Sequence, residues 1–290
     1  MAEFRWSTEH RDVVRQQPRA LEIRAAAELL LDPNPRVHEA CEQTLLAWGE
    51  ASRTALEALC EDDDRQARIR VQRVLRTINV RSWLTNFREF AIRADRELER
   101  GMLLIAQLPR PLLDDTVVSA TFDDWADQLF SQVEGLGPRK LAAQLSRFFH
   151  GDLAFRGDRN NYYDPDNSFL DQVVKNRCGV PITLCAVWLL VGRRVGLPLE
   201  GVGLPGHFIV RIRAARSILV DPFHGGRVLT RRDCVDRLQA MGYTFRESFL
   251  EPVSDRRMLI RALGNLLHTV GFGDDQLLSG AVQEARRSLV

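Results

Sequence analysis

Three residues in the second half of the chain have the types and spacing of a site for acyl transfer. Cys178 precedes an apolar run that begins at Pro181, His207 opens the run HFIVRI, and Asp221 ends the run SILVD. A thiolate can attack an amide carbonyl, an imidazole can take up the thiol proton, and a carboxylate can orient that imidazole. The order of these residues therefore permits a Cys178, His207 and Asp221 triad.

A thiol in such a triad needs a pKa low enough to populate the thiolate. Cys178 lies just ahead of a predicted helix N-terminus, where unpaired amides and the helix dipole favour a negative charge. Cys185 lies one turn inside the apolar helix and is predicted to be a small core residue. A single cysteine in a loop most often has no chemical role, so position alone does not make Cys178 a nucleophile.

The pair His207 and Asp221 is the stronger part of the pattern. A Pro-Gly turn directly precedes His207, and a polar ring at the start of an apolar strand needs a partner. Asp221 lies 14 residues later, across a predicted hairpin, so we expect the two side chains to be hydrogen-bonded. His224 follows Asp221 by three residues, and a metal site formed by these three side chains is an alternative. The main prediction is a site without a metal or cofactor.

The elements that position these residues are a buried helix and a small antiparallel sheet. The run PITLCAVWLLVGRRV, starting at Pro181, is apolar on nearly all sides, which is typical of a buried helix, and Gly196 and Pro198 end it. Three β-branched runs follow, LEGVGL, HFIVRIR and SILVDPF, and the short connection 214–216 predicts a hairpin between the last two. We expect every strand of substantial length to lie between about 195 and 230.

A polar and aromatic segment precedes the buried helix. Its core is the sequence DPDNSF, followed by a short predicted helix at 168–176 for which Ser168 is a candidate N-cap. Asp and Asn side chains can bond to turn amides, and aromatic side chains can anchor a loop. We therefore expect residues 160–168 to form an ordered loop against the helix near Pro181, anchored by Tyr162, Tyr163 and Phe169.

The first half of the chain is predicted to be helical. Short amphipathic helices extend from Arg19 to about Ile78, and an offset of 29 residues aligns two similar segments, which indicates a degenerate pair of HEAT-type repeats. An irregular helical bundle explains the same pattern. The predicted organisation is a HEAT-like region at 1–80, a helical segment at 81–150, a mixed core at 151–232 and a C-terminal helical segment at 233–290.

Composition excludes several classes of protein. The chain has 290 residues, 45% hydrophobic and 27% charged, with a net charge of +1, so it is an ordinary globular protein with no sign of nucleic-acid binding. Five scattered cysteines do not form a disulfide framework, which favours a reducing compartment. The N-terminal residues resemble no secretion signal, and no apolar stretch is long enough for a membrane span. We expect a cytoplasmic protein that does not bind membranes.

The stretch Asn161–Leu229 resembles a known family. Its linked motifs DPDNSFL, R-x-GVPITL, VGRRVGLPLEGVGLPGHF and DPFHGG are similar to the transglutaminase-like core of the SirB-type bacterial proteins, a module also found in a eukaryotic F-box protein. The resemblance implies a papain-like α+β core with a cysteine at the N-terminus of the central helix, a histidine on one strand and an aspartate on the next. His207 and Asp221 match the last two. The expected position of the nucleophile falls at Pro181 or Ile182, whereas the thiols of this chain lie at 178 and 185.

This resemblance leads to two functional hypotheses. Members of the SirB type often lack a cysteine around R-x-G-x-P, so the first hypothesis is a non-catalytic module that binds a polypeptide or a small ligand, and the second is a cysteine-dependent amide hydrolase or acyltransferase. The resemblance implies an α+β fold in which an all-helical N-terminal region precedes a papain-like core. The residues expected to line or support the cleft are Asn167, Gly179, Pro181, Gly206 and His224.

Overall fold

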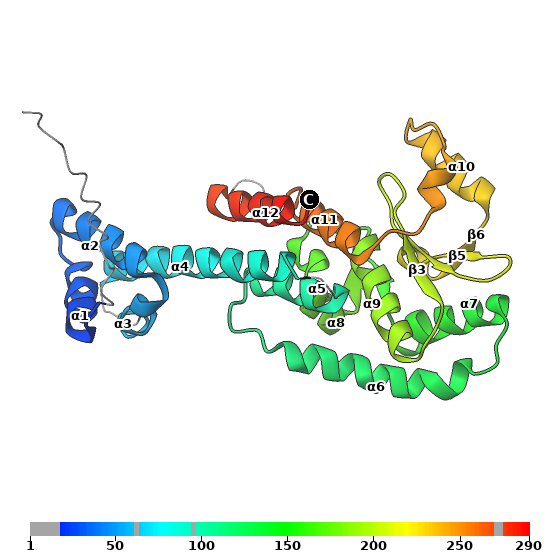
Figure 1. The fold of residues 1–290 in the computed structure, drawn as a ribbon, viewed down its shortest axis with the longest axis horizontal. Coiled ribbons are helices and arrows are strands. Elements are labelled where there is room, and N and C mark those ends of the chain that lie inside the picture. Colours follow the sequence, from blue (N-terminus) through cyan, green and yellow to red (C-terminus); the bar gives the residue numbers. More distant parts are fainter. Residues whose placement is uncertain (1–17, 61–63, 94–96, 270–274) are drawn as a thin grey trace, which may run out of the picture. The chain divides into compact units, whose positions relative to one another are not determined.

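The computed structural model describes residues 18–60, 64–93, 97–269 and 275–290 of the chain. The chain divides into two compact units, Met1–Ile78 and Asn79–Val290, which Figure 1 colours from blue to cyan and from cyan to red. The N-terminal segment used above to argue against a secretion signal lies outside the described residues. The second unit contains all the candidate site residues.

The first unit consists of helices in its described part. They are α1 (Ala20–Leu29), α2 (Pro35–Trp48), α3 (Arg53–Glu57) and the first part of α4 (Arg65–Ala91). The side chain of Asn34 caps α2, and Pro35 occupies its first position, where a missing N–H costs nothing. Leu30, Leu45 and Leu56 are fully buried in a small core of this unit.

The second unit is a mixed helical and β structure. The remaining helices are α5 (Leu98–Gln107), α6 (Asp115–Val133), α7 (Pro138–Ser146), α8 (Leu170–Asn176), α9 (Pro181–Arg194), α10 (Arg231–Ala240), α11 (Asp255–Leu266) and α12 (Gln276–Ser288). Four strands, β3 (Leu199–Val202), β4 (Ile209–Ile212), β5 (Ile218–Asp221) and β6 (Arg227–Leu229), form one antiparallel sheet in the order β3-β4-β5-β6. The α+β class is therefore confirmed.

Helix α9 is the centre of the second unit. It contacts α5, α6, α8 and α11 as well as strands β3 and β4, and every residue from Pro181 to Gly192 is buried. Trp188, the largest of these side chains, stacks on Phe149 with ring centroids 4.8 Å apart. A helix surrounded in this way needs an apolar side chain on every face, which explains its sequence.

The sheet separates two apolar clusters. Val210, Ile212 and Val220 belong to the large core around α9, whereas Ile209 and Leu219 belong to a smaller cluster with Cys234 and Leu238 of α10. This alternation is the two-residue period of a strand covered on both faces. Asp221 ends β5, and Arg237 of α10 lies 3.7 Å from its Oδ2 atom.

Two strands lie outside the window predicted for the sheet. The strands β1 (Arg156–Gly157) and β2 (Cys178–Gly179) pair in parallel, with Arg156 opposite Cys178. Strands of two residues have no periodicity, so no sequence pattern indicates them. Up to residue 140, the described part of the chain contains helices and turns and no strand, as predicted. None of the helices within the described ranges is both long and apolar enough to cross a bilayer.

Candidate functional site

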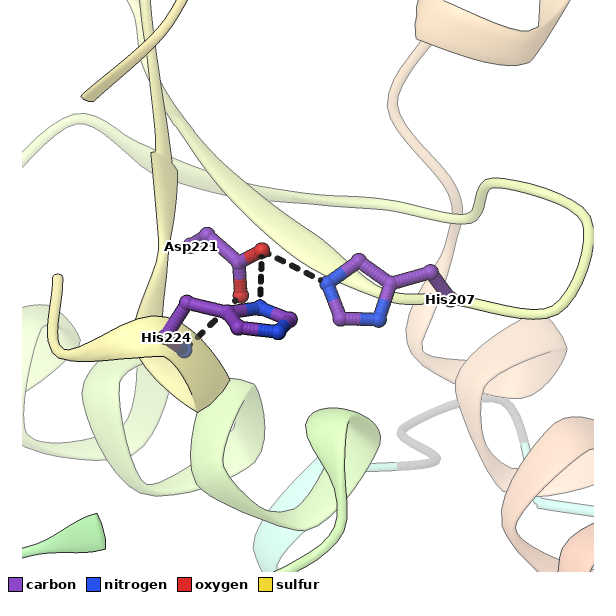
Figure 2. A group of neighbouring side chains, drawn as sticks. All are labelled: His207, Asp221 and His224. Carbon is purple, nitrogen blue, oxygen red and sulfur yellow. Dashed lines mark hydrogen bonds and ion pairs between the residues drawn. The ribbon is translucent and has the colours of Figure 1, made fainter. Parts of the chain in front are cut away.

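The predicted hydrogen bond between His207 and Asp221 is present. Nε2 of His207 lies 2.8 Å from Oδ2 of Asp221, and both side chains are buried, at 4% and 0% exposed (Figure 2). The antiparallel register of β4 and β5 pairs Val210 with Val220. Residues 207 and 221 are therefore diagonal neighbours on one face of the sheet, close enough for two polar side chains to meet.

The carboxylate of Asp221 also holds His224. Nδ1 of His224 lies 2.8 Å from the same Oδ2 atom, and the backbone N–H groups of Phe223 and His224 donate to Oδ1. Gly225 and Gly226, at φ of 71° and 70°, turn the chain directly after His224. A Cβ atom on Gly226 would collide with Ser146, so this turn is tightly packed. Figure 2 shows the two imidazole rings converging on one carboxylate.

The charges of this group are fixed by burial and by its hydrogen bonds. Burial lowers the pKa of His207 below its ordinary value, although the bond to Asp221 opposes this effect, so the ring is neutral at neutral pH. Burial raises the pKa of Asp221, but the bonds and charges of His207 and His224 outweigh it and leave the pKa lowered. Asp221 is therefore an anion, and the Arg237 guanidinium lies 3.7 Å from its Oδ2 atom.

This geometry defines the tautomer of His207. A carboxylate can only accept, so Nε2 of His207 carries the proton and Nδ1 remains an acceptor. Figure 2 shows Nδ1 on the side of the ring away from Asp221. His207 is thus arranged as an imidazole that can accept a proton or a hydrogen bond at Nδ1, with Asp221 as its orienting partner.

Cys178 lies in different surroundings. It forms part of β2, is 8% exposed, and has the Asp158 carboxylate as the strongest charge acting on its thiol. Burial raises the pKa of the Cys178 thiol, and the Asp158 charge raises it further, against a smaller lowering by Arg156. The raised pKa differs from the expectation that a helix N-terminus activates this thiol, because burial and the Asp158 charge favour its neutral form.

Cys185 also has a neutral thiol. The side chain is completely buried within α9, and burial followed by the Asp221 charge raises the pKa of the thiol well above its ordinary value. The prediction of a core cysteine is confirmed by this burial. Asp221 influences Cys185 electrostatically, whereas the charges that influence Cys178 are those of Asp158 and Arg156.

A cavity of about 300 Å³ adjoins His207 at the N-terminus of α9. Of the expected cleft residues, Pro181 and Gly206 line it, together with Ile182 at the position where the resemblance places a nucleophile. The complete lining among the described residues is Tyr162, Tyr163, Ser168, Val180, Pro181, Ile182, Gly206, His207, Phe208, Arg261, Asn265, His268 and Thr269. This set includes neither a cysteine nor an acidic residue.

Asn167 and Gly179 are not among the residues that line the cavity, but they contact the start of α9, which does line it. The carbonyl oxygen of Asn167 accepts hydrogen bonds from the Val180 N–H and the Thr183 hydroxyl, at 3.3 and 2.8 Å. A Cβ atom on Gly179 would come within 2.8 Å of the Thr183 hydroxyl, so only glycine fits there. The segment 160–168 is therefore folded against the start of α9, as predicted.

The aromatic anchors of this segment differ from one another. Tyr162 is partly buried against the large core, and Phe169 is 2% exposed, whereas Tyr163 is 58% exposed. The prediction is right for the first two residues and wrong for Tyr163, whose ring packs edge-on against Tyr162 at the cavity.

Sequence reasoning missed two polar residues of the cavity. Ser168 is not the N-cap of α8, which begins at Leu170 after Phe169, and its buried hydroxyl has no hydrogen-bond partner. Arg261 is the second: it lies in α11 (Asp255–Leu266), and with Asn265 in the same helix and His268 just after the helix end it forms a polar stripe at positions i, i+4 and i+7. That stripe is the signal that would have indicated these residues.

The side chains of His207, Asp221 and His224 are the candidate metal ligands among the described residues. Their ligand atoms lie within 4.8 Å of one another. Nε2 of His207 and Nδ1 of His224 are already hydrogen-bonded to the same carboxylate oxygen of Asp221. The Arg237 guanidinium also lies 3.4 Å from Nδ1 of His224. This positive charge opposes the binding of a divalent cation, so the geometry favours a hydrogen-bonded group over a metal site.

Comparison with known proteins defines the class of the chain. The model of the transglutaminase-like superfamily matches residues 116–264, which extend from α6 into α11 and include Cys178, His207, Asp221 and His224. The chain belongs to this superfamily.

Individual relatives come from bacteria and from mammals. A UPF0162 protein of Xylella fastidiosa (strain Temecula1) is 38% identical over 60% of this chain and 64% of its own length, and that of strain 9a5c is 39% identical over 58% and 62%. The chain thus spans less than two thirds of these relatives. F-box only protein 21 of Mus musculus is 32% identical over 51% of this chain and 24% of its own length. No solved structure matches the chain.

Proposed function

We propose that this protein is a non-catalytic member of the superfamily, of the SirB type, and that its cavity binds a ligand. The observation that carries this proposal is the lining of the cavity at the N-terminus of α9. Pro181 and Ile182 occupy this position beside His207, and the described lining contains no thiol. Thiol catalysis needs a nucleophile within hydrogen-bond reach of its base.

The electrostatics of Cys178 support the same proposal. A catalytic cysteine has a lowered pKa, because a cation or a helix N-terminus stabilises its thiolate. Burial and Asp158 raise the pKa of Cys178 instead. A thiol that remains protonated near pH 7 is a poor nucleophile, so the amide hydrolase or acyltransferase hypothesis lacks an activated group.

The pair of His207 and Asp221 keeps a role in a binding module. The buried carboxylate holds the imidazole in one tautomer, and Nδ1 is available as a hydrogen-bond acceptor for a ligand. A buried polar group with fixed geometry gives specificity without any reaction, because a ligand that leaves it unpaired binds poorly.

The N-terminal unit belongs to this proposal as a docking surface for a polypeptide. Its helices α1 and α2 pack against each other, as paired helices do in HEAT-type repeats. Such repeats bind partners along the surface of the helix array. A HEAT-like origin of this unit remains part of the proposal.

Thiol reactivity tests the proposal directly. We expect Cys178 to react with iodoacetamide no faster than the partly exposed Cys41, and His207→Gln to change the Cys178 rate by less than about twofold, because no base acts on this thiol. Time-resolved alkylation with peptide mass mapping measures both rates in the same sample. The variant His224→Gln is the matched control, since it removes the other imidazole from Asp221.

The alternative hypothesis makes the opposite prediction. If Cys178 were a nucleophile, it would react much faster than Cys41 and would lose this advantage in His207→Gln but not in His224→Gln. Such a result would refute the non-catalytic proposal and identify a thiol enzyme.

A further inference from the structure

The cavity beside His207 has an apolar wall. The side chains of Tyr162, Val180, Ile182 and Phe208 contribute to it, and its volume of about 300 Å³ is at the lower end for small-molecule sites. No acidic side chain is present in the described lining. A ligand of this cavity therefore needs an apolar part of limited size.

One cation faces this cavity from α11. The Arg261 guanidinium donates a hydrogen bond to the His207 carbonyl oxygen at 2.8 Å, and it lies over the Phe208 ring at 5.3 Å from the centroid. The titratable side chains that act on its charge are Cys185 and Tyr162, which are neutral at pH 7. Within the described ranges, no carboxylate pairs with Arg261. A partly buried cation without a counter-ion favours an anionic ligand.

Two further donors face the same cavity. Ser168 is 3% exposed, and its hydroxyl has no hydrogen-bond partner. Helix α9 begins here with Val180 as its N-cap, which offers no side-chain cap, so its first amides and its dipole also favour a negative charge. Asn265 of α11 and His268, just after the end of α11, extend the polar side of the cavity.

We propose that this cavity binds the carboxylate of an apolar acid, with Arg261 as the ion-pair partner and Ser168 as a donor to the carboxylate. This inference rests on the proposed binding function and specifies its ligand. The planar guanidinium fits a carboxylate, and the apolar wall takes the adjoining side chain. One guanidinium matches one negative charge, which favours a monoanion over a phosphate. A free acid and the C-terminus of a peptide both supply this chemistry.

Calorimetric titration of the full chain tests the proposal with matched probes. N-acetyl-phenylalanine and N-acetyl-phenylalaninamide have the same shape but carry a carboxylate and a neutral amide, respectively. An octapeptide ending in phenylalanine is compared with its C-terminal amide in the same way. We expect both acids to bind and each amide to bind at least about tenfold more weakly, as for a lost hydrogen-bonded charge pair. An octapeptide acid that binds more tightly than the free acid identifies a peptide C-terminus as the source, and equal affinities identify a free acid.

Variants connect the binding to the named residues. We expect Arg261→Gln to weaken binding of the acids about 10- to 100-fold, Arg261→Lys to weaken it less, and Ser168→Ala to weaken it about threefold to tenfold. The control is Arg257→Gln, because Arg257 lies one turn earlier on α11 and is exposed. It should bind like the unaltered protein. If Arg261→Gln does not fold, the affinities of Arg261→Lys and Ser168→Ala for the acids test the proposal.

The outcomes separate this inference from the proposed function. Four results would each overturn the carboxylate site. They are equal binding of acid and amide, preferential binding of inorganic phosphate, no binding of any acid, and an affinity of Arg261→Lys and Ser168→Ala that equals that of the unaltered protein. The titration is repeated with Cys178→Ser, in which we expect unchanged affinity. The proposed non-catalytic function would be refuted by a different result, namely alkylation of Cys178 at a rate that depends on His207.

Discussion

The sequence suggests one triad, but the strands that carry His207 and Asp221 and the segment that carries Cys178 differ in their chemistry. In the strand region, His207 and His224 share the Asp221 carboxylate, with both bonds at 2.8 Å. In the region before α9, burial and the Asp158 charge raise the pKa of the Cys178 thiol. The first region is a complete hydrogen-bonded group, whereas the second lacks the charge that would activate a thiol.

The difference shows that a buried His-Asp pair does not by itself place an activated thiol beside it. Removal of a partner from Asp221 leaves a buried charge or ring unpaired, which affects folding as well as chemistry. The start of α9, where the resemblance places a nucleophile, carries no such constraint, because Pro181 and Ile182 are compatible with a helix N-terminus. A His-Asp pair in a superfamily member is therefore weak evidence for catalysis unless the thiol environment agrees.

The largest expected effect is on folding stability when Asp221 is removed. We expect Asp221→Ala to lower the free energy of unfolding by about 3–5 kcal/mol, because two imidazoles and two backbone amides lose their acceptor. Cys178→Ala should cost only about 1–2 kcal/mol, the value for a small buried side chain. Denaturant unfolding of both variants measures this contrast between the two regions.

Asp236 provides the control for that measurement. It lies on α10, is exposed, and forms only a loose i, i+4 pair with Arg232 at 3.7 Å, so we expect Asp236→Ala to change stability by less than about 0.5 kcal/mol. If Asp221→Ala is as stable as Cys178→Ala or more stable, the predicted difference between the two regions is wrong.

The second prediction concerns acid. The pKa of His207 lies below the ordinary 6.5, so the unfolded chain binds more protons than the folded chain below that pH. The stability from the neutral ring is complete above pH 6.5 and declines as the pH falls toward the folded pKa, by at most about 1.4 kcal/mol per pH unit for one histidine. Asp221 does not contribute in this range, because its pKa is lowered from 3.8 and its loss comes at lower pH.

Unfolding curves between pH 5 and 7.5 measure this slope. We expect a shallower slope in His207→Gln and an unchanged slope in Cys178→Ala. Burial also lowers the pKa of His150, so part of the slope remains in the first variant. Identical slopes in all three proteins would contradict the assignment of the neutral buried ring to His207.

The smallest effect concerns the thiol region. Asp158→Asn removes the charge next to Cys178, so the thiol pKa should fall toward its ordinary value. The alkylation rate at pH 8 should rise a few-fold, since one pKa unit changes the thiolate fraction at most about tenfold. Asp166→Asn, in the same loop, is the control and should leave the rate unchanged. An unchanged rate in Asp158→Asn as well would show that burial alone keeps this thiol protonated.

Much of the fold could be predicted because local patterns repeat over many residues. The apolar character of 181–195 predicted the buried helix α9, and the β-branched runs predicted β3, β4 and β5 in sequence order. The strands β1 and β2 escaped prediction because two residues show no period. Ser168 was interpreted as a helix cap, although the 3-10 turn of residues 165–168 delays the start of α8.

The candidate site was predictable in its strand half only. The spacing of His207 and Asp221 is sufficient for their contact, because a short hairpin fixes the register between its strands. Nothing local connects Arg261 with His207, since α11 reaches this cavity only through packing against the core.

The sequence by itself determined the α+β class, the central helix and the His207–Asp221 pair, because hydrophobic period and hairpin length act over short distances along the chain. Only the tertiary structure decided that the Asp158 charge acts on Cys178, that Pro181 and Ile182 border the cavity, and that Arg261 faces it. These properties depend on burial and on charges contributed by distant elements, and the pKa of a thiol follows from the sum of those surroundings.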